Sequence, residues 1–382
     1  MTQRYFVFDD DHEAYRESVR SFVSKELAPH AEDWEQAEDF PDETFRRMGE
    51  LELFGNKFEE KYGGTGAGYL FEAVLVEEMA RCGSGGVAAG LGAHAQIALP
   101  PIATFGNEEQ KKRWLAPGIK GEKIAALGIT EPEAGSDVSG IKTRAVRDGD
   151  DYILNGSKMY ITNGCRADMV VTAVRTGPDP HGGVSFMVVE KGTPGFDQST
   201  RLKKLGWRAS DTAQLFFSDC RVSSANMLGS EGAGFPMIMS NFQWERLTMA
   251  LGAVTGAEQT LKLARDYAET RIAFKRPIVR FQAIKHKLVE MATEIEMARH
   301  LTYHALWLFS QGRDAVKEVS MAKIAATETA TRVADEAVQI HGGYGYMMEF
   351  PVQRAWRDAR LGPIGGGTTQ IMREIIAKSM DL

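Results

Sequence analysis

The residues in this sequence that could do chemistry occur in short clusters of glycines, hydroxyl-bearing residues and charged residues. Such clusters combine hydrogen-bonding groups with glycines that let the backbone turn or approach a ligand closely. Taken singly, each is also what an ordinary loop, strand end or helix end contains. The clusters lie at residues 128–137, 159–164, 271–276, 339–346 and 365–370.

Motifs of several large enzyme classes are absent. The sequence contains no Glu-x-x-His, no HExxH, no GxxxxGK[ST] and no GxSxG, which disfavours di-iron, zinc-protease, P-loop and serine-hydrolase chemistry. Its three cysteines, Cys82, Cys165 and Cys220, are far apart and form no CxxC. We therefore expect no metal site, no disulfide framework and a reducing compartment.

Composition places the chain among ordinary globular proteins. It has 382 residues, 43% of them hydrophobic and 25% charged, with a net charge of −7, so no global basic field favours nucleic acid. Glycine is the outlier: there are 39, about one residue in ten against a usual ~7%.

Two segments bear on location. Acidic residues occur within the first nine positions and no apolar run follows, which predicts that no signal peptide is present. Residues 82–107 lack any charge, but they contain many glycines, His94, Gln96 and the pair Pro100-Pro101. We interpret this stretch as a buried wall or pocket lining, and expect a cytoplasmic protein without an integral membrane segment.

Periodicity divides the chain into an α-helical region at 1–124, a β region at 125–233 and a second helical region at 234–382. Apolar runs predict strands at 152–154, 169–174, 184–189 and 214–217, and the pairs Asp148-Gly149 and Asn155-Gly156 predict turns. Stripes spaced by three and four residues after 234 are typical of an antiparallel bundle. The α–β–α order argues against a Rossmann domain.

In their order and spacing, these clusters resemble the FAD-dependent acyl-CoA dehydrogenases along essentially the whole chain. The resemblance implies an α+β multidomain protein with an N-terminal α-helical domain, a middle β domain and a C-terminal four-helix bundle, assembled as a homotetramer. The matching segments are Tyr62-Gly63-Gly64, ITEPEAGSD, MYITNG, Glu245-Arg246, RIAFKRPI, QIHGGYGY and GGGTTQI.

The resemblance also implies how FAD is bound, between the β domain and the bundle. An arginine suits a bidentate contact with pyrophosphate, and paired glycines let the backbone approach a cofactor. Residues implied near the flavin ring are Leu127, Ile129, Thr130, Ser136, Tyr160, Ile161 and Thr162, with Thr162 near the N5 atom that accepts hydride. Those implied to reach the FAD of a neighbouring subunit are Arg271, Phe274, Gln339, Gly342 and Gly343, and further FAD contacts are Gln282, Thr368 and Gln370.

The catalytic base departs from the commonest family pattern. That pattern has a glutamate in a Tyr-Glu-Gly-Thr motif, and the matching residue here is Gly366. Long-chain and isovaleryl-CoA members also have glycine there and take a glutamate from an earlier helix, where this sequence has Glu245. Periodicity alone would make Glu245 a surface carboxylate paired with Arg246 or Lys262, but the resemblance favours the base.

Other substrate contacts follow from the same resemblance. The Gly366 amide and an FAD ribityl hydroxyl would form an oxyanion hole for the thioester. Arg246 would orient the site, and Ser136, Gln243 and Gly367 would contact the acyl-CoA. The implied product is a trans-2-enoyl-CoA, with electrons passing to an electron-transfer flavoprotein, as in fatty acid β-oxidation.

The substrate and two rival functions stay open at this point. Glycines between 82 and 107 would leave room for a long or branched acyl tail. A flavin oxidase or monooxygenase could use the same scaffold, and the chain could also be an inactive helical binding protein.

Overall fold

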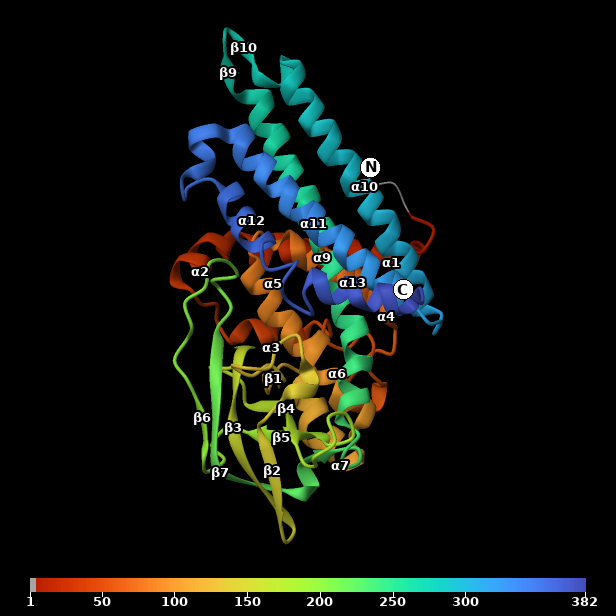
Figure 1. The fold of residues 1–382 in the computed structure, drawn as a ribbon. Coiled ribbons are helices and arrows are strands. Elements are labelled where there is room, and N and C mark those ends of the chain that lie inside the picture. The colour runs from red at the N-terminus through yellow and green to blue at the C-terminus, as the bar shows by residue number, and fades with distance from the viewer. Residues whose placement is uncertain (1–4) are drawn as a thin grey trace.

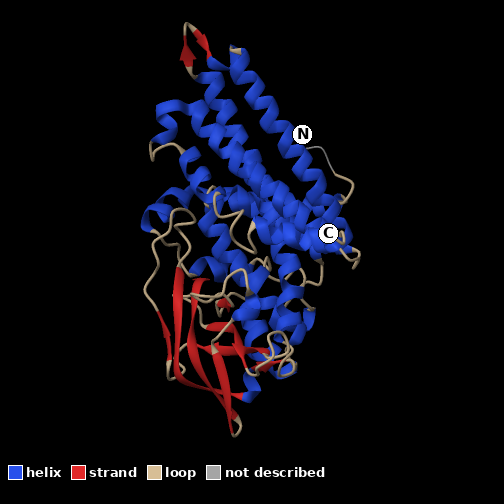
Figure 2. Ribbon diagram, viewed as in Figure 1, coloured by secondary structure: helices blue, strands red, loops and turns tan. Residues whose placement is uncertain are grey.

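The computed structural model describes residues 5–382 and has helices, then a sheet, then helices again (Figures 1 and 2). This confirms the expected fold class. The N-terminal helices surround a core that contains Phe40, Phe45 and Phe54. They are α1 (Asp10–Phe22), α2 (Ala31–Ala37), α3 (Glu43–Glu50), α4 (Tyr69–Met79), α5 (Gly85–Gly92), α6 (Leu99–Phe105), α7 (Glu108–Gln110) and α8 (Ala116–Ile119).

The uncharged stretch at 82–107 forms α5, the short helical segment η5 (Ala93–Ala98) and α6. Leu99 and Ile102 are fully buried against the middle of the molecule. In the part of the chain that the structure describes, no helix is both long and apolar enough to cross a membrane. The interpretation as a buried wall is therefore confirmed.

A twisted sheet forms the middle of the chain, in the order β6-β7-β3-β2-β4-β5-β8, with β1 paired in parallel to β4. Each predicted apolar run lies within one of these strands. β4 and β5 are buried on both faces, which explains their unbroken apolar sequences. The strands are β1 (Ala125–Gly128), β2 (Arg144–Asp148), β3 (Asp151–Thr162), β4 (Met169–Arg175), β5 (Val184–Glu190), β6 (Phe196–Gln198), β7 (Thr212–Ser223) and β8 (Met227–Leu228).

One of the two predicted turns is wrong. Gly149, with φ of +66°, does turn the chain between β2 and β3. Asn155 and Gly156 instead lie inside β3, where the pairing with β7 shifts register at a β-bulge. The Asn155 side chain bonds across the strands, donating to Asp219 Oδ1 at 3.1 Å and accepting from the Asp219 amide at 2.9 Å.

The C-terminal region is built around α9 (Gly234–Thr270), which runs between the sheet and the far end of the molecule (Figure 1). Its first turns pack on the sheet through Met237 and Ile238, and later turns pack in the helical core. Buried alanines on α9 and α11, among them Ala257 and Ala326, allow close packing. The other elements are β9 (Ile272–Ala273), β10 (Arg276–Pro277), α10 (Gln282–Ser310), α11 (Val316–His341), α12 (Pro351–Ala359) and α13 (Thr369–Ser379).

Candidate active site

Glu245 and Gly366 face the same space although they are far apart in the chain. Glu245 lies on α9, and Gly366 lies in the loop that precedes α13. A Cβ atom built on Gly366 would be 3.6 Å from Glu245 Oε1. A side chain at position 366 would therefore enter the space that the Glu245 carboxylate occupies.

Among the residues that the structure describes, the Glu245 carboxylate has no salt-bridge partner. Glu245 as a residue is half-buried, but its Oε2 atom is shut off from solvent and accepts no hydrogen bond within residues 5–382. Lys262 instead pairs with Asp266 at 2.6 Å. Arg246, the other partner considered, donates from Nε to the Gly366 carbonyl at 3.2 Å. Glu245 is thus not an ordinary surface ion pair.

The surroundings of Glu245 alter its acidity. Burial raises the pKa of this carboxyl to about 7, and the positive charges of Arg246 and Lys323 only partly oppose the rise. A carboxyl with a pKa near neutrality can accept a proton efficiently at physiological pH. Perturbed carboxyls in such places mark functional sites more often than structural ones.

Glycine is favoured at 366 and 367 by backbone conformation. Their φ angles are +61° and +93°, in the region that favours glycine. A Cβ on Gly366 would lie 2.7 Å from Met249 Sδ, and one on Gly367 would lie 2.7 Å from Met372 Cε. The backbone conformation therefore favours glycine at 366, whereas the contacts come from the ends of flexible methionine side chains.

Sequence reasoning missed Lys323 on α11, which holds this loop. Lys323 is 1% exposed, and its Nζ atom donates to the Gly365 carbonyl at 2.7 Å and to the Gly367 carbonyl. Burial lowers the pKa of this lysine to about 8, and Arg246 adds to the effect. The available signal was a lysine beside the apolar stripe of Val319, Ala322 and Ala326.

The residues expected near a flavin ring gather where β1 ends and β3 ends. The Met159 amide donates to the Thr130 carbonyl at 2.8 Å, which joins the segment after β1 to the end of β3. Tyr160 has φ of +62° and is 69% exposed, next to buried Ile161. Leu127, Ile129 and Thr162 lie in the same region, while Ser136 is exposed in the following loop.

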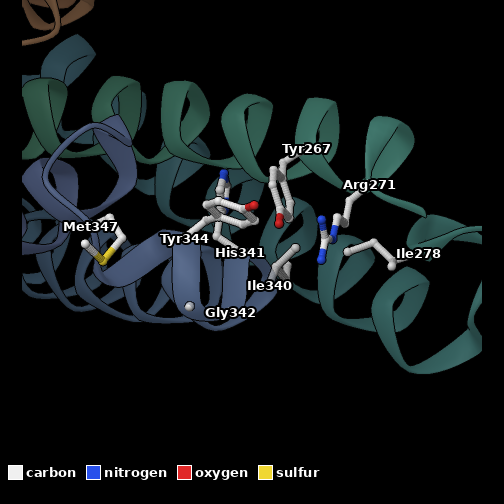
Figure 3. Close-up of a pocket in the computed structure, with 9 residues that line it drawn as sticks. Tyr267, Arg271, Ile278, Ile340, His341, Gly342, Tyr344 and Met347 are labelled. Atoms are coloured by element: carbon white, nitrogen blue, oxygen red, sulfur yellow. The ribbon is translucent and has the colours of Figure 1, made fainter. Parts of the chain in front are cut away.

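A second group of expected cofactor residues lines a pocket of about 490 Å³ at the other end of α9. Arg271 and Tyr267 extend from α9 toward Tyr344, and the Arg271 guanidinium lies 5.4 Å from the Tyr344 ring centroid (Figure 3). Gly342 and Gly343 border the same pocket. The remaining expected residues in this part of the chain, Phe274, Gln282 and Gln339, are exposed.

A third group lies at the start of α13. Thr368 caps this helix by accepting a hydrogen bond from the Ile371 amide at 3.3 Å. Thr368 and Gln370 line a pocket of about 620 Å³ together with Arg360 and Trp356. Gln243, on α9, is half-buried and lies about 200° around the helix from Glu245, since each residue turns it by about 100°.

The second group has features that suit the diphosphate of a ligand such as FAD. Arg271 presents a fixed fork of donors that matches a diphosphate. A Cβ on Gly342 or Gly343 would meet no atom within 4 Å, so the pocket leaves the backbone open to a ligand. Among the described residues, no cluster of His, Cys, Asp or Glu could hold a metal ion.

Glu245 and the second group lie far apart in the molecule. Glu245 and Arg271 lie on and directly after the same straight helix, 26 residues apart. At a rise of about 1.5 Å per residue, they are separated by about 39 Å. Figure 1 likewise places the β9–β10 hairpin and the sheet at opposite ends of the molecule.

Most glycines between 82 and 107 do not clear space, which corrects that expectation. A Cβ on Gly85 would lie 2.7 Å from the Trp207 ring, one on Gly86 2.7 Å from the Ala209 amide nitrogen, and one on Gly90 2.7 Å from the Phe40 ring. These glycines allow close packing between distant segments. At Gly92 alone among the glycines of α5 would a Cβ meet nothing within 4 Å.

Comparisons with known proteins agree with this architecture. Residues 9–122, 126–220 and 232–380 match the N-terminal, middle and C-terminal domains of acyl-CoA dehydrogenases. An acyl-CoA dehydrogenase of Bacillus subtilis (strain 168) is 43% identical over 364 residues, covering 95% of this chain and 96% of that protein. The mitochondrial long-chain specific acyl-CoA dehydrogenase of Sus scrofa is 40% identical over 377 residues, covering 98% of this chain and 87% of that protein.

The fold agrees as closely. The crystal structure of an acyl-CoA dehydrogenase from Geobacillus kaustophilus has a TM-score of 0.95 to this chain at 43% identity, with 100% of both chains covered. The chain therefore belongs to the acyl-CoA dehydrogenase family and is a flavin-dependent oxidoreductase. Relatives named for long-chain, isovaleryl and short-chain substrates all match at 37–40% identity, so the similarity spans several substrate subgroups.

Proposed function

We propose that this dehydrogenase converts a fatty or branched acyl-CoA to its trans-2-enoyl-CoA, with Glu245 as the base that removes the α-proton. The observation that carries the proposal is the Glu245 carboxylate beside Gly366, with Oε2 buried and unpartnered. The raised pKa of about 7 fits a group that must take up and release a proton near neutral pH.

The chain's own groups divide the remaining work. Glu245 accepts the α-proton at Oε2, and the Gly366 amide stabilises the negative charge that develops on the thioester oxygen. Arg246 holds the Gly366 carbonyl and thereby keeps the glycine loop next to α9. A bound FAD would supply the oxidised ring that takes up the β-hydrogen as hydride. Ser136, Gln243 and Gly367 remain proposed contacts of the acyl-CoA.

The cofactor residues support assembly as a homotetramer. The group around Arg271 is about 39 Å along α9 from Glu245, so it would serve the FAD of a neighbouring subunit. Phe274, 89% exposed at the tip of the hairpin, would be covered by that neighbour. We further propose a cytoplasmic enzyme of fatty acid β-oxidation that passes electrons to an electron-transfer flavoprotein, with domains at 1–124, 125–233 and 234–382.

Anaerobic bleaching of the flavin tests the reaction and the substrate class together. The holoenzyme is mixed with a panel of short, long, isovaleryl and other branched acyl-CoAs, and the loss of flavin absorbance is followed. We expect reduction by long or branched members of the panel. Bleaching by none of them would contradict the proposed substrate class.

Glu245→Gln tests the base. We expect flavin reduction at least about 10³-fold slower, because general base catalysis contributes about 10²–10⁴-fold, while FAD remains bound. Glu258→Gln is the matched control, since Glu258 lies on the same helix and pairs with Arg81 at 2.8 Å. Reduction at the normal rate in Glu245→Gln would refute the assignment.

Reoxidation of the reduced flavin distinguishes a dehydrogenase from an oxidase. After reduction by substrate, the flavin of a dehydrogenase should be reoxidised slowly by air and quickly by electron-transfer flavoprotein. Fast reoxidation by air would instead identify an oxidase.

A further inference from the structure

The loop at 365–367 is held by two buried cations that both leave Glu245 unpaired. Lys323 Nζ donates to the carbonyls of Gly365 and Gly367, and Arg246 Nε donates to the carbonyl between them, that of Gly366. Lys323 and Arg246 are 1% and 6% exposed. Within residues 5–382 neither donates a hydrogen bond to Glu245 Oε2, which has no partner.

These contacts determine where the amides of the loop point. A peptide bond is planar and trans, so its N–H lies opposite its C=O. Holding the Gly365 carbonyl toward Lys323 therefore turns the Gly366 N–H away from Lys323 and α11. Holding the Gly366 carbonyl toward Arg246 turns the Gly367 N–H away from Arg246 and α9. Neither amide donates a hydrogen bond to any part of the chain that the structure describes.

Gly366 lies beside Glu245. The Cβ direction of Gly366 leads to Glu245 Oε1 at 3.6 Å, and glycine conformations with positive φ keep the loop in this shape. A hydrogen bond to a carbonyl also polarises the peptide, which makes its N–H a stronger donor. The buried cations that bond to the loop carbonyls therefore orient the loop amides and make them stronger hydrogen-bond donors to a developing negative charge.

We propose that Lys323 is a positioning residue for the reaction: by holding the Gly365 and Gly367 carbonyls, it aims the Gly366 amide at the thioester oxygen of the acyl-CoA. The proposal rests on the proposed function, because it assigns the support of the same site. Lys323 touches neither substrate nor the reacting atoms, and it acts through the glycine loop.

The test measures how well the site stabilises an enolate without requiring a base. A 3-oxoacyl-CoA has an acidic α-proton that exchanges with water, so its bound enolate can be titrated by absorbance in the holoenzyme carrying Glu245→Gln. In that background, we expect Lys323→Met to raise the apparent pKa of the bound ligand by about one unit or more, a tenfold loss of enolate stabilisation.

Two further variants separate the hydrogen bond from simple loss of a buried lysine. Lys323→Gln can donate to a carbonyl but has no charge, and should recover part of the shift. Lys204→Met is the control: Lys204 is half-buried, its pKa is lowered to about 8 by burial, and it holds Ser210 and Thr212 in another part of the molecule. It should leave the ligand pKa unchanged.

With Glu245 present, Lys323→Met should slow flavin reduction by about 10²-fold with little change in acyl-CoA affinity, because only the transition state uses the donor fully. An unshifted enolate pKa in both Lys323 variants overturns the proposal. If Lys323→Met loses its flavin, Lys323→Gln alone decides. If Glu245→Gln stays active, the base assignment fails while the enolate titration still judges Lys323.

Discussion

Two glutamates, each near a buried lysine, have side-chain pKa values shifted in opposite directions in this molecule. In the loop after β1, Glu131 Oε1 lies 2.7 Å from Lys158 Nζ and also accepts from the Thr143 amide at 2.9 Å. Burial alone would raise the pKa of Glu131, but the Lys158 charge and these hydrogen bonds bring it below its usual value. Glu245 has no such partner, and burial raises its pKa to about 7.

The difference lies in what the lysine contacts. Lys158 bonds directly to its carboxylate and makes a structural ion pair. Lys323 bonds to two glycine carbonyls and leaves Glu245 within its field but out of contact. The two carboxyls therefore differ in one direct hydrogen bond: Glu131 has it with its lysine, and Glu245 lacks it within the described residues.

Removing Lys158 should have the largest effect. Lys158→Met leaves Glu131 buried without its partner, and we expect a loss of about 3–5 kcal/mol in the free energy of unfolding. Chemical denaturation of the holoenzyme measures it. Adding Glu131→Gln to the same chain should restore part of the loss, and an unchanged denaturation midpoint in Lys158→Met would mean that the pair is not structural.

The pH dependence of stability should differ between Glu245 and Glu131, and this effect should be smaller than that of Lys158→Met. Glu245 has a folded pKa of about 7 against an ordinary 4.5, so the folded state prefers its protonated form and loses stability as the pH rises from about 4.5 to about 7. Above pH 7, Glu245→Gln should be more stable than the natural chain by about 3 kcal/mol.

For Glu131 the sign is reversed, because its folded pKa is below the ordinary value. Its contribution is present above the ordinary pKa and is lost as the pH falls through the folded pKa. Denaturation of Glu245→Gln at pH 5 and pH 8, and of Glu131→Gln at about pH 3 and pH 8, checks both signs. A Glu245→Gln gain that is equal at the two pH values would contradict the raised pKa.

The smallest expected effect is a rescue. Gly366→Glu in the Glu245→Gln chain places a carboxylate in the same space from the opposite side, and should raise flavin reduction by straight-chain acyl-CoA at least about tenfold over Glu245→Gln alone. Recovery should be partial, because φ of +61° and Met249 Sδ at 2.7 Å oppose a side chain there. Gly366→Gln is the control, and no recovery in a flavin-bound protein would show that the two positions do not serve the same carbon.

Much of the fold could be predicted from the sequence because local patterns determine it. The stripes of α9 to α11 and the apolar runs of β4 and β5 are local signals. Asn155-Gly156 misled because the hydrogen bonds of Asn155 to Asp219, on another strand, replace the turn. The packing role of Gly85 could not be read either, since the ring it contacts belongs to Trp207.

The site was predicted in part, and by resemblance rather than by physics. The resemblance predicts Glu245 as the base in place of a glutamate at position 366. In the structure, a Cβ built on Gly366 would lie 3.6 Å from Glu245 Oε1. Lys323 escaped because a lysine beside an apolar stripe looks like the edge of a solvated helix face. Only the folded chain reveals that it lies beneath a loop 42 residues later.

The length of α9 determines which subunit a substitution in this helix would affect. Its early turns carry the proposed base, and its end carries the arginine proposed to serve a neighbour's cofactor. Each complete catalytic centre would then need two copies of the chain, one that supplies Glu245 and one that supplies Arg271. A substitution of Glu245 would impair the centre of its own subunit, and a substitution of Arg271 would impair the centre of a neighbouring subunit.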